Sequence, residues 1–270
     1  MIRLLATDLD GTLLQSGGTV SEENVRALGR AAEEGLDVIF VTGRPPRWMT
    51  DIPAMTGYQG LAICANGALT MDLATGEVLS ATHIDPLIGL EVCGLLREVD
   101  PGITFAAELS LASDNFVIDP LYETRWERDI QFPRMPVEQM FETDAVIKLM
   151  ARPSVNAKVD ADSFLSSALA VVAGHVEVTH SDIHNVLLEI SVLGVNKGSG
   201  LENYATRLGH DASQVSAVGD MPNDIEMIRW AGRGAAVANA HDEVKAVADV
   251  HLPSNDDHAV AVLINSILSN

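Results

Sequence analysis

Apolar residues near the start of the chain fall into short runs that are separated by helix and turn signals. The runs at residues 2–7, 36–41 and 61–65 are each followed by turn residues, as is typical of buried parallel strands. Between the first two runs, Ser21 is a natural helix cap, acidic residues follow it, and Gly35 can close the helix. The pattern therefore predicts alternating strands and helices.

The C-terminal third resumes the same alternation, so both ends of the chain are expected to build one parallel sheet with helices on both faces. One helix expected in this core begins at residues 45–46, and three more are expected at 197–208, 224–230 and 258–268. A hairpin is expected at 68–71 and 78–81, and further strands at 215–218, 235–238 and 247–250.

The middle of the chain has a different pattern, and we interpret it as an inserted second domain. Its helix-like segments and strand-like runs suit an open sheet with two helices. The helices are expected at 86–99 and 160–172, and the strands at 103–107, 115–118, 146–150, 176–179 and 186–190. The sequence thus predicts a discontinuous core of residues 1–82 and 187–270, with an α/β domain inserted at 83–186.

Composition and charge narrow the possible partners. Apolar residues make up 47% of the 270 positions, which is enough for a large core. No apolar run approaches the roughly 18 residues of a membrane span, and the first eight residues turn acidic too soon for a secretory signal. The formal charge of −21 disfavours nucleic acid and anionic membranes as partners. We expect a soluble cytoplasmic protein, with Cys64 and Cys93 as buried free thiols.

The stretch Asp8-Leu9-Asp10-Gly11-Thr12, directly after the first expected strand, is the strongest chemical signal. Residues two apart on a strand share a face, so Asp8 and Asp10 are expected together at the carboxyl end of the sheet, where ligands bind. Two adjacent carboxylates are costly unless a cation binds them, and Mg²⁺ prefers such oxygen ligands. The alternative interpretation is an ordinary Asp-Gly surface turn.

A second segment and a lysine suit a phosphate group. Thr42-Gly43-Arg44 follows the second expected strand, where a hydroxyl and backbone N–H groups ahead of a helix can hold an anion. Taken alone, such a segment is more often only a helix start. Lys197 begins a helix, where a cation opposes the helix dipole, so it is a solvated lysine unless it faces a phosphate and aspartates.

A third segment adds two carboxylates and an amide after a strand of the C-terminal third. Asp220 occupies the position equivalent to Asp8 on another strand, whereas Asp224 could also be an ordinary helix cap; Asn223 lies between them. Together with Asp8 and Asp10, these residues are predicted to place four acidic side chains in one small site.

The order of these motifs, each at the end of a strand or the start of a helix, resembles the haloacid dehalogenase-like hydrolase superfamily. The large insert ahead of Lys197 is similar to that of the Cof-type phosphatases of subclass IIB. Residues 235–240 and 254–260 are similar to the family's tail, although His258 stands where the family usually has glycine. The resemblance implies an α/β fold, with a Rossmann-like parallel-sheet core and an inserted α/β cap domain of the C2B type.

The resemblance further implies a Mg²⁺-dependent phosphoric monoester hydrolase that forms an aspartyl-phosphate on Asp8. Asp10 would be the general acid and base. Its presence favours phosphate esters, because relatives that cleave carbon–halogen bonds lack it. The implied metal residues are Asp8, Asp10 through its backbone carbonyl, and Asp220. Asp224 would either join them or orient Lys197 or a metal-bound water.

The phosphoryl oxygens would be shared by Thr42, the Gly43 N–H, Asn223 and Lys197, and Arg44 would contact the substrate. The implied substrates are small phosphorylated metabolites, sugar phosphates first among them, and a monomer or homodimer is expected. The residues of the inserted domain that contact the leaving group cannot be derived; Asp114, Asn115, Arg125 and His184 are candidates.

Two alternatives stay open. The first is a phosphosugar mutase of the same subclass, which would pass phosphate between sugar hydroxyls through Asp8. The second is a catalytically silent sugar-phosphate sensor, which is disfavoured because a sensor need not retain Asp10.

Overall fold

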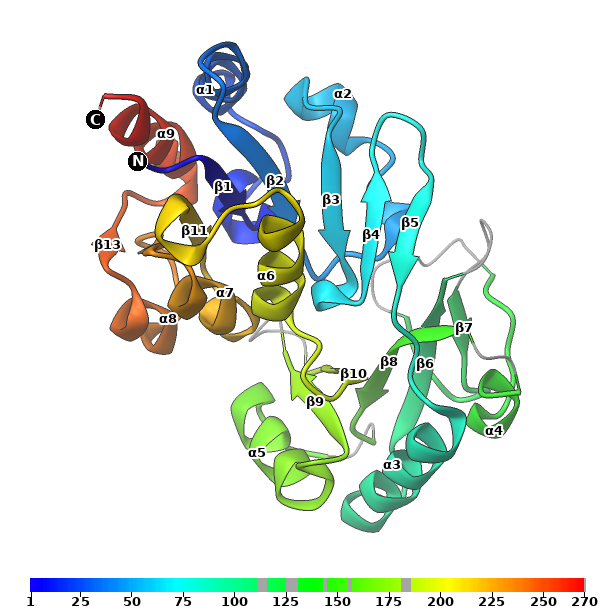
Figure 1. Ribbon diagram of the computed structural model, residues 1–270. Coiled ribbons are helices and arrows are strands. Elements are labelled where there is room, and N and C mark those ends of the chain that lie inside the picture. The colour runs from blue at the N-terminus through cyan, green and yellow to red at the C-terminus, as the bar shows by residue number, and fades with distance from the viewer. Residues whose placement is uncertain (111–115, 125–130, 143–144, 155–156, 181–185, 270) are drawn as a thin grey trace. The chain divides into compact units, whose positions relative to one another are not determined.

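The chain forms two compact units, seen in a computed structural model that describes residues 1–270 except 111–115, 125–130, 143–144, 155–156, 181–185 and 270 (Figure 1). The first unit comprises Met1–Ser80 with Asn196–Asn270, and the second comprises Ala81–Val195. Among the described residues, no helix combines the length and the apolar character needed to cross a membrane.

An eight-stranded sheet in the order β13-β12-β11-β1-β2-β3-β4-β5 forms the centre of the first unit. The strands from β13 to β3 pair in parallel, and β4 pairs antiparallel with β3. Their bounds are β1 Leu4–Thr7, β2 Asp37–Val41, β3 Leu61–Cys64, β4 Leu69–Asp72, β5 Val78–Ala81, β11 Val215–Gly219, β12 Arg233–Ala236 and β13 Val250–His251.

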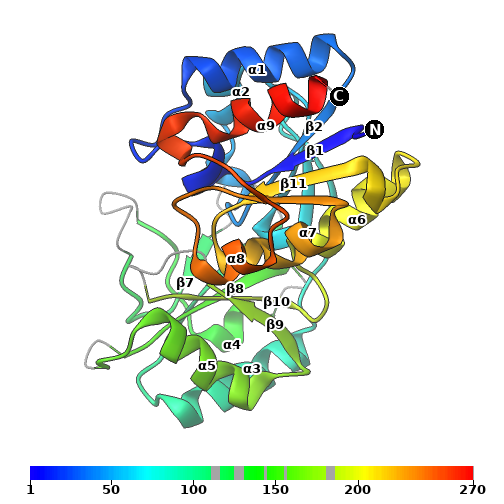
Figure 2. The same ribbon diagram turned by 90° about the vertical axis from the view of Figure 1, so that its left-hand side faces the viewer.

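Helices cover both faces of this sheet, with α1 and α9 on one face and α6 and α7 on the other (Figures 1 and 2). The buried Asn24 side chain ties α1 to α9, because its oxygen accepts the Ala261 N–H at 2.9 Å. The bounds are α1 Glu22–Glu33, α2 Ile52–Thr56, α6 Lys197–Arg207, α7 Ile225–Trp230, α8 Asp242–Val247 and α9 Ala259–Leu268. The expected α/β fold with a parallel-sheet core is therefore confirmed.

Two expected core elements differ in the structure. The helix expected at residues 45–46 is only a short 3-10 turn, Pro46–Trp48. The strand expected at 247–250 forms later in the chain, as β13 Val250–His251, because α8 continues to Val247. The His241 side chain caps that helix by accepting the Glu243 N–H, and an apolar run alone did not reveal the cap.

His258 has left-handed backbone dihedrals, with φ of 63° and ψ of 38°, directly before α9. Glycine adopts this region at little cost, which explains why a glycine is usual here in the family that the sequence resembles. The backbone of His258 is therefore strained. Its Nε2 lies 3.7 Å from Glu23 Oε2 on α1.

A five-stranded antiparallel sheet in the order β7-β6-β8-β10-β9 forms the second unit, together with α3, α4 and α5. The strands are β6 Thr104–Leu109, β7 Phe116–Ile118, β8 Val146–Arg152, β9 Val176–Thr179 and β10 Leu188–Val192. The helices are α3 Pro86–Val99, α4 Val137–Met140 and α5 Ala161–Val172.

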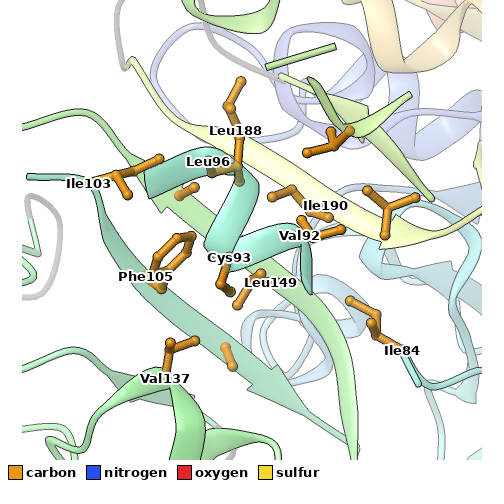
Figure 3. Close-up of a cluster of buried hydrophobic side chains, with 14 of the residues drawn as sticks. Ile84, Val92, Cys93, Leu96, Ile103, Phe105, Val137, Leu149, Leu188 and Ile190 are labelled. Carbon is orange, nitrogen blue, oxygen red and sulfur yellow. The ribbon is translucent and has the colours of Figure 1, made fainter. Parts of the chain in front are cut away.

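The core of the second unit lies between its three helices and this sheet. Figure 3 shows Val92, Cys93 and Leu96 of α3 facing sheet residues such as Phe105 and Leu149. All five are buried. Cys93 is a free thiol within this core, and Cys64 is likewise free and buried in β3, so both expectations for the cysteines are confirmed.

The second unit is longer at both ends than the insert of residues 83–186 expected from the sequence, because it also contains residues 81–82 and 187–195. The later boundary is set by β10, which pairs antiparallel with both β8 and β9 and so completes the second sheet. The apolar run of β10 would also suit a strand of the first sheet, and only its pairing shows that it belongs to the second.

Candidate active site

Asp8 follows the last residue of β1 and lies at the carboxyl end of the parallel sheet. Its backbone N–H donates to the Val218 carbonyl of β11 at 3.0 Å, which extends the β1–β11 ladder by one residue. The side chain is buried. Because Thr7 pairs with Val218, the residues that follow the two strands are brought to one place.

Asp10 does not share the environment of Asp8, which corrects the expectation that both lie on one strand face. Strand β1 ends at Thr7, and residues Leu9–Leu13 form a tight turn in which the period of two no longer applies. The Asp10 side chain is 60% exposed, whereas that of Asp8 is 6% exposed.

Lys197, the first residue of α6, joins two buried carboxylates. Its Nζ lies 2.6 Å from Asp8 Oδ1 and 2.6 Å from Asp224 Oδ1, and its side chain is 1% exposed. The Asn196 side chain caps the helix by accepting the Ser199 N–H at 2.9 Å, which fixes where α6 begins. Lys197 is therefore the internal counter-ion of the site and not a solvated lysine.

Asp220 lies against the turn that follows β1. Its Oδ1 accepts the Thr12 hydroxyl at 2.9 Å. Gly11 has φ of 76°, and a Cβ at this position would lie 2.3 Å from Asp220 Oδ2. Glycine at position 11 thus serves both the left-handed turn and the close approach of a carboxylate.

Asp224 is held by protein donors on both oxygens. Its Oδ1 accepts from Lys197, and its Oδ2 accepts the backbone N–H groups of Asp220 and Met221, each at 2.9 Å. The carboxylate closes the loop after β11, so the geometry favours a role in holding this loop and Lys197.

Asp8, Asp220 and Asp224 form a buried cluster in which one oxygen of each lies within 4.8 Å of the others. Burial raises the pKa of Asp8 well above its usual range, and Lys197 only partly opposes this effect. Burial and the neighbouring Asp224 raise the pKa of Asp220 to about 7. Burial alone would lower the pKa of Lys197, but the two adjacent carboxylates raise it above its usual value.

The donor set of this cluster fits a hard divalent cation. It contains three carboxylates and one ammonium, so negative charge is left over, and every available ligand atom is an oxygen. Mg²⁺ prefers carboxylate oxygens and water. Within the described residues, Asp8 and Asp220 are the members of the cluster with one oxygen that accepts no hydrogen bond from the protein.

The remaining expected phosphate residues line the same sheet edge. Thr42 is buried, and its hydroxyl oxygen accepts the Arg44 N–H at 3.0 Å; Gly43 lies between them. Asn223 Nδ2 donates to Asn66 Oδ1 at 3.0 Å. Asn66 was not among the residues that the sequence predicted for the site. Its φ of 55° is a turn property, but its partner is 157 residues away.

Arg44 makes a bidentate ion pair with Asp10. Its Nε lies 2.7 Å from Asp10 Oδ2, and its Nη2 lies 2.5 Å from Oδ1. The sequence did not predict this pair, because it depends on how the turn after β1 directs an exposed side chain. The candidates Asp114, Asn115, Arg125 and His184 all lie outside the described residues.

Comparison with known proteins matches residues 5–264 to the family model of the haloacid dehalogenase-like hydrolases. The chain belongs to this family. It is 30% identical over 276 residues to a putative phosphatase of Bacillus subtilis, YxeH, with 99% of each chain covered. It is 27% identical over 281 residues to the pyridoxal phosphate phosphatase YbhA of Escherichia coli, with 98% of each covered. The expected enzyme class, a phosphoric monoester hydrolase, is confirmed.

Solved structures show the same fold. BT1666 of Bacteroides thetaiotaomicron, described among the phosphatases of the haloalkanoate (HAD) enzyme superfamily, is 26% identical with a TM-score of 0.82, covering 98% of this chain and 95% of that one. The subclass IIB sugar phosphatase BT4131 is 20% identical with a TM-score of 0.80, covering 98% of each chain. The expected core and cap fold is thereby confirmed.

Proposed function

We propose that the protein is a Mg²⁺-dependent phosphohydrolase of small phosphorylated metabolites, sugar phosphates first among them, with Asp8 as its nucleophile. The observation that carries this proposal is the 2.6 Å contact of Lys197 Nζ with Asp8 Oδ1, which fixes a buried carboxylate beside Asp220. Fixed geometry favours in-line attack, because the reacting atoms must meet at a defined distance and angle.

Two displacements complete the reaction. An Asp8 oxygen attacks phosphorus, the bond from phosphorus to the ester oxygen breaks, and Asp10 gives its proton to that oxygen. Asp10 then takes a proton from a water molecule whose oxygen attacks the aspartyl-phosphate. The bond to Asp8 breaks, inorganic phosphate leaves, and one water has been consumed. General acid–base help of this kind contributes about 10²–10⁴-fold to the rate.

The phosphoryl oxygens would be held by Lys197, the Thr42 hydroxyl, the Gly43 N–H and the Asn223 amide. Asn223 has two amide hydrogens, and the one not used on Asn66 is available to an oxygen of the substrate. Donors that are fixed before the reaction stabilise charge on the transferring group without rearranging.

A metal ion would be held by Asp8, Asp220 and the backbone carbonyl of Asp10, with Asp224 as a supporting residue. When bound, Mg²⁺ supplies positive charge that neutralises phosphoryl oxygens. The uncompensated negative charge of the aspartate cluster supports this assignment.

The test is release of inorganic phosphate from a panel of sugar monophosphates, with Mg²⁺ or with EDTA. We expect turnover only with Mg²⁺, and we expect Asp8→Asn to abolish it. Asp242→Asn is a matched control, because the Asp242 side chain is fully exposed on α8. Acid-quenched enzyme should carry one phosphoryl group on Asp8 by mass spectrometry.

Two results would contradict the proposal. Unchanged turnover in Asp8→Asn would remove the nucleophile assignment, and absence of turnover on the whole panel would favour a sensor. Isomerisation of a sugar phosphate without phosphate release would instead identify a mutase.

A further inference from the structure

The four aspartates of the site are held in different ways, and Asp10 stands apart. The other three are buried and bonded to Lys197, to Thr12 or to backbone N–H groups. Asp10 is mostly exposed, and in the part of the chain that the structure describes only Arg44 hydrogen bonds to its carboxylate. The residue that must exchange protons is thus oriented by a single side chain.

Arg44 is built to hold a carboxylate in one orientation. The guanidinium uses two N–H groups on the two Asp10 oxygens, an arrangement that fixes the plane of the carboxylate as well as its position. Arg44 is itself anchored, because its N–H donates to Thr42 and its carbonyl accepts the Ala65 N–H at 3.0 Å. Its Nη1 also lies 3.4 Å from the Trp48 carbonyl.

The turn that carries Asp10 supplies no comparable restraint. Asp10 has φ of −73° and ψ of 121°, Gly11 follows with φ of 76°, and no side chain caps the turn. An exposed aspartate in such a turn can adopt several rotamers. A proton donor must lie within hydrogen-bond reach of the leaving oxygen, so an unrestrained carboxylate would be productive only part of the time.

We propose that Arg44 is a positioning residue for Asp10, and not a contact to the substrate as expected from the sequence. The inference rests on the proposed function, in which Asp10 is the general acid and base. The guanidinium occupies one lone pair of each Asp10 oxygen, and the remaining lone pairs exchange the proton. Arg44 itself gives up no proton and forms no bond to phosphorus.

The first test compares two leaving groups by kcat/KM, which reports the step up to aspartyl-phosphate formation. 4-Nitrophenolate leaves without a proton, whereas the alkoxide of glycerol 3-phosphate needs one. Arg44→Gln should lower kcat/KM for glycerol 3-phosphate by about 10²-fold, the loss expected for a misplaced catalytic group. The kcat/KM for 4-nitrophenyl phosphate should be nearly retained, which also shows that the variant is folded. Arg44→Lys keeps the charge but loses the two parallel N–H donors of the guanidinium. Its kcat/KM for glycerol 3-phosphate should therefore lie between those of the wild type and Arg44→Gln.

The second test is a double-mutant cycle on glycerol 3-phosphate. If Arg44 acts through Asp10, Arg44→Gln should cost little further activity in an Asp10→Asn background. Arg26→Gln is the charge-matched control, since Arg26 is an exposed α1 residue paired with Glu23. Arg26→Gln should leave kcat/KM unchanged for both substrates.

The outcomes separate this inference from the proposed function. Equal losses of kcat/KM on both esters, or additive losses in the double-mutant cycle, would overturn the positioning role of Arg44. Phosphate release by the wild type would still support the proposed function. A wild type that released phosphate from neither ester, nor from any sugar monophosphate of the panel, would overturn both.

Discussion

Replacement of Lys197 by methionine tests whether one ammonium group holds the aspartate cluster together. In the native site Lys197 Nζ lies 2.6 Å from both Asp8 and Asp224, and all three side chains are buried. Methionine fills a similar volume without charge. The variant therefore keeps the packing and leaves the carboxylates without their counter-ion.

The magnitude follows from the burial of the partners. Removing one member of a buried ion pair costs about 3–5 kcal/mol, because the charge left behind remains desolvated. This is a large part of the roughly 5–15 kcal/mol that stabilises a typical domain. The cost should depend on pH. The folded-state pKa values of Asp8 and Asp220 are raised above the unfolded value, so the folded protein binds more protons, and acidification below about pH 7 stabilises it.

The assay is urea unfolding followed by circular dichroism at pH 8 and pH 5, with EDTA. We expect Lys197→Met to lose about 3–5 kcal/mol at pH 8 and clearly less at pH 5. Addition of Mg²⁺ at pH 8 should restore part of the loss, since a cation bound to the folded state stabilises it. Lys245→Met is the control. Lys245 is more exposed and lies 3.7 Å from the fully exposed Asp242, so about 1 kcal/mol or less is expected. Equal losses for the two variants, or the same loss at both pH values, would refute this account.

The remaining predictions concern the turn after β1 and its contact with Asp220. Asp220→Asn should reduce the stabilisation that the metal-free protein gains on acidification from pH 8 to pH 4, because only the contribution of Asp8 remains, and should also abolish the Mg²⁺-induced rise in Tm; both are measured by thermal unfolding. Gly11→Ala should weaken Mg²⁺ binding by calorimetry and destabilise more than Gly18→Ala. Both glycines have φ of 76°, but a Cβ at position 18 meets nothing within 4 Å. Thr12→Val should cost about 1–3 kcal/mol in urea unfolding, because Asp220 loses a buried hydrogen bond; equal stability of the two proteins would contradict this.

The part of the site that the sequence predicted depends on sheet topology. Apolar runs followed by acidic residues place Asp8 and Asp220 at strand ends, and parallel strands bring such ends to one edge. The register of β1 with β11, in which Thr7 pairs with Val218, confirms this reasoning. The prediction needed only the ends of the strands and their common direction, which the alternation of strands and helices along the chain indicates.

The part that the sequence did not predict depends on turns and on long-range side-chain pairs. Asp10 was placed by the strand period, but the strand had already ended at Thr7. The pairs Asn66–Asn223 and Asp10–Arg44 join turns that are far apart in the chain. Their formation is set by loop dihedrals of a few residues, for which a single sequence gives residue preferences and no directions.

The distribution of partners separates the roles of the aspartates better than their spacing does. Asp224 has donors on both oxygens, so protein groups already compensate its charge while it holds Lys197 and the loop. Asp220 has a hydroxyl partner and no direct cation, and its pKa is raised to about 7. The charge that the protein leaves uncompensated therefore lies on the Asp220 side of the cluster. We infer that Asp220, rather than Asp224, is the carboxylate that joins Asp8 in binding Mg²⁺. The fold can bear this charge because Lys197 already neutralises the other side.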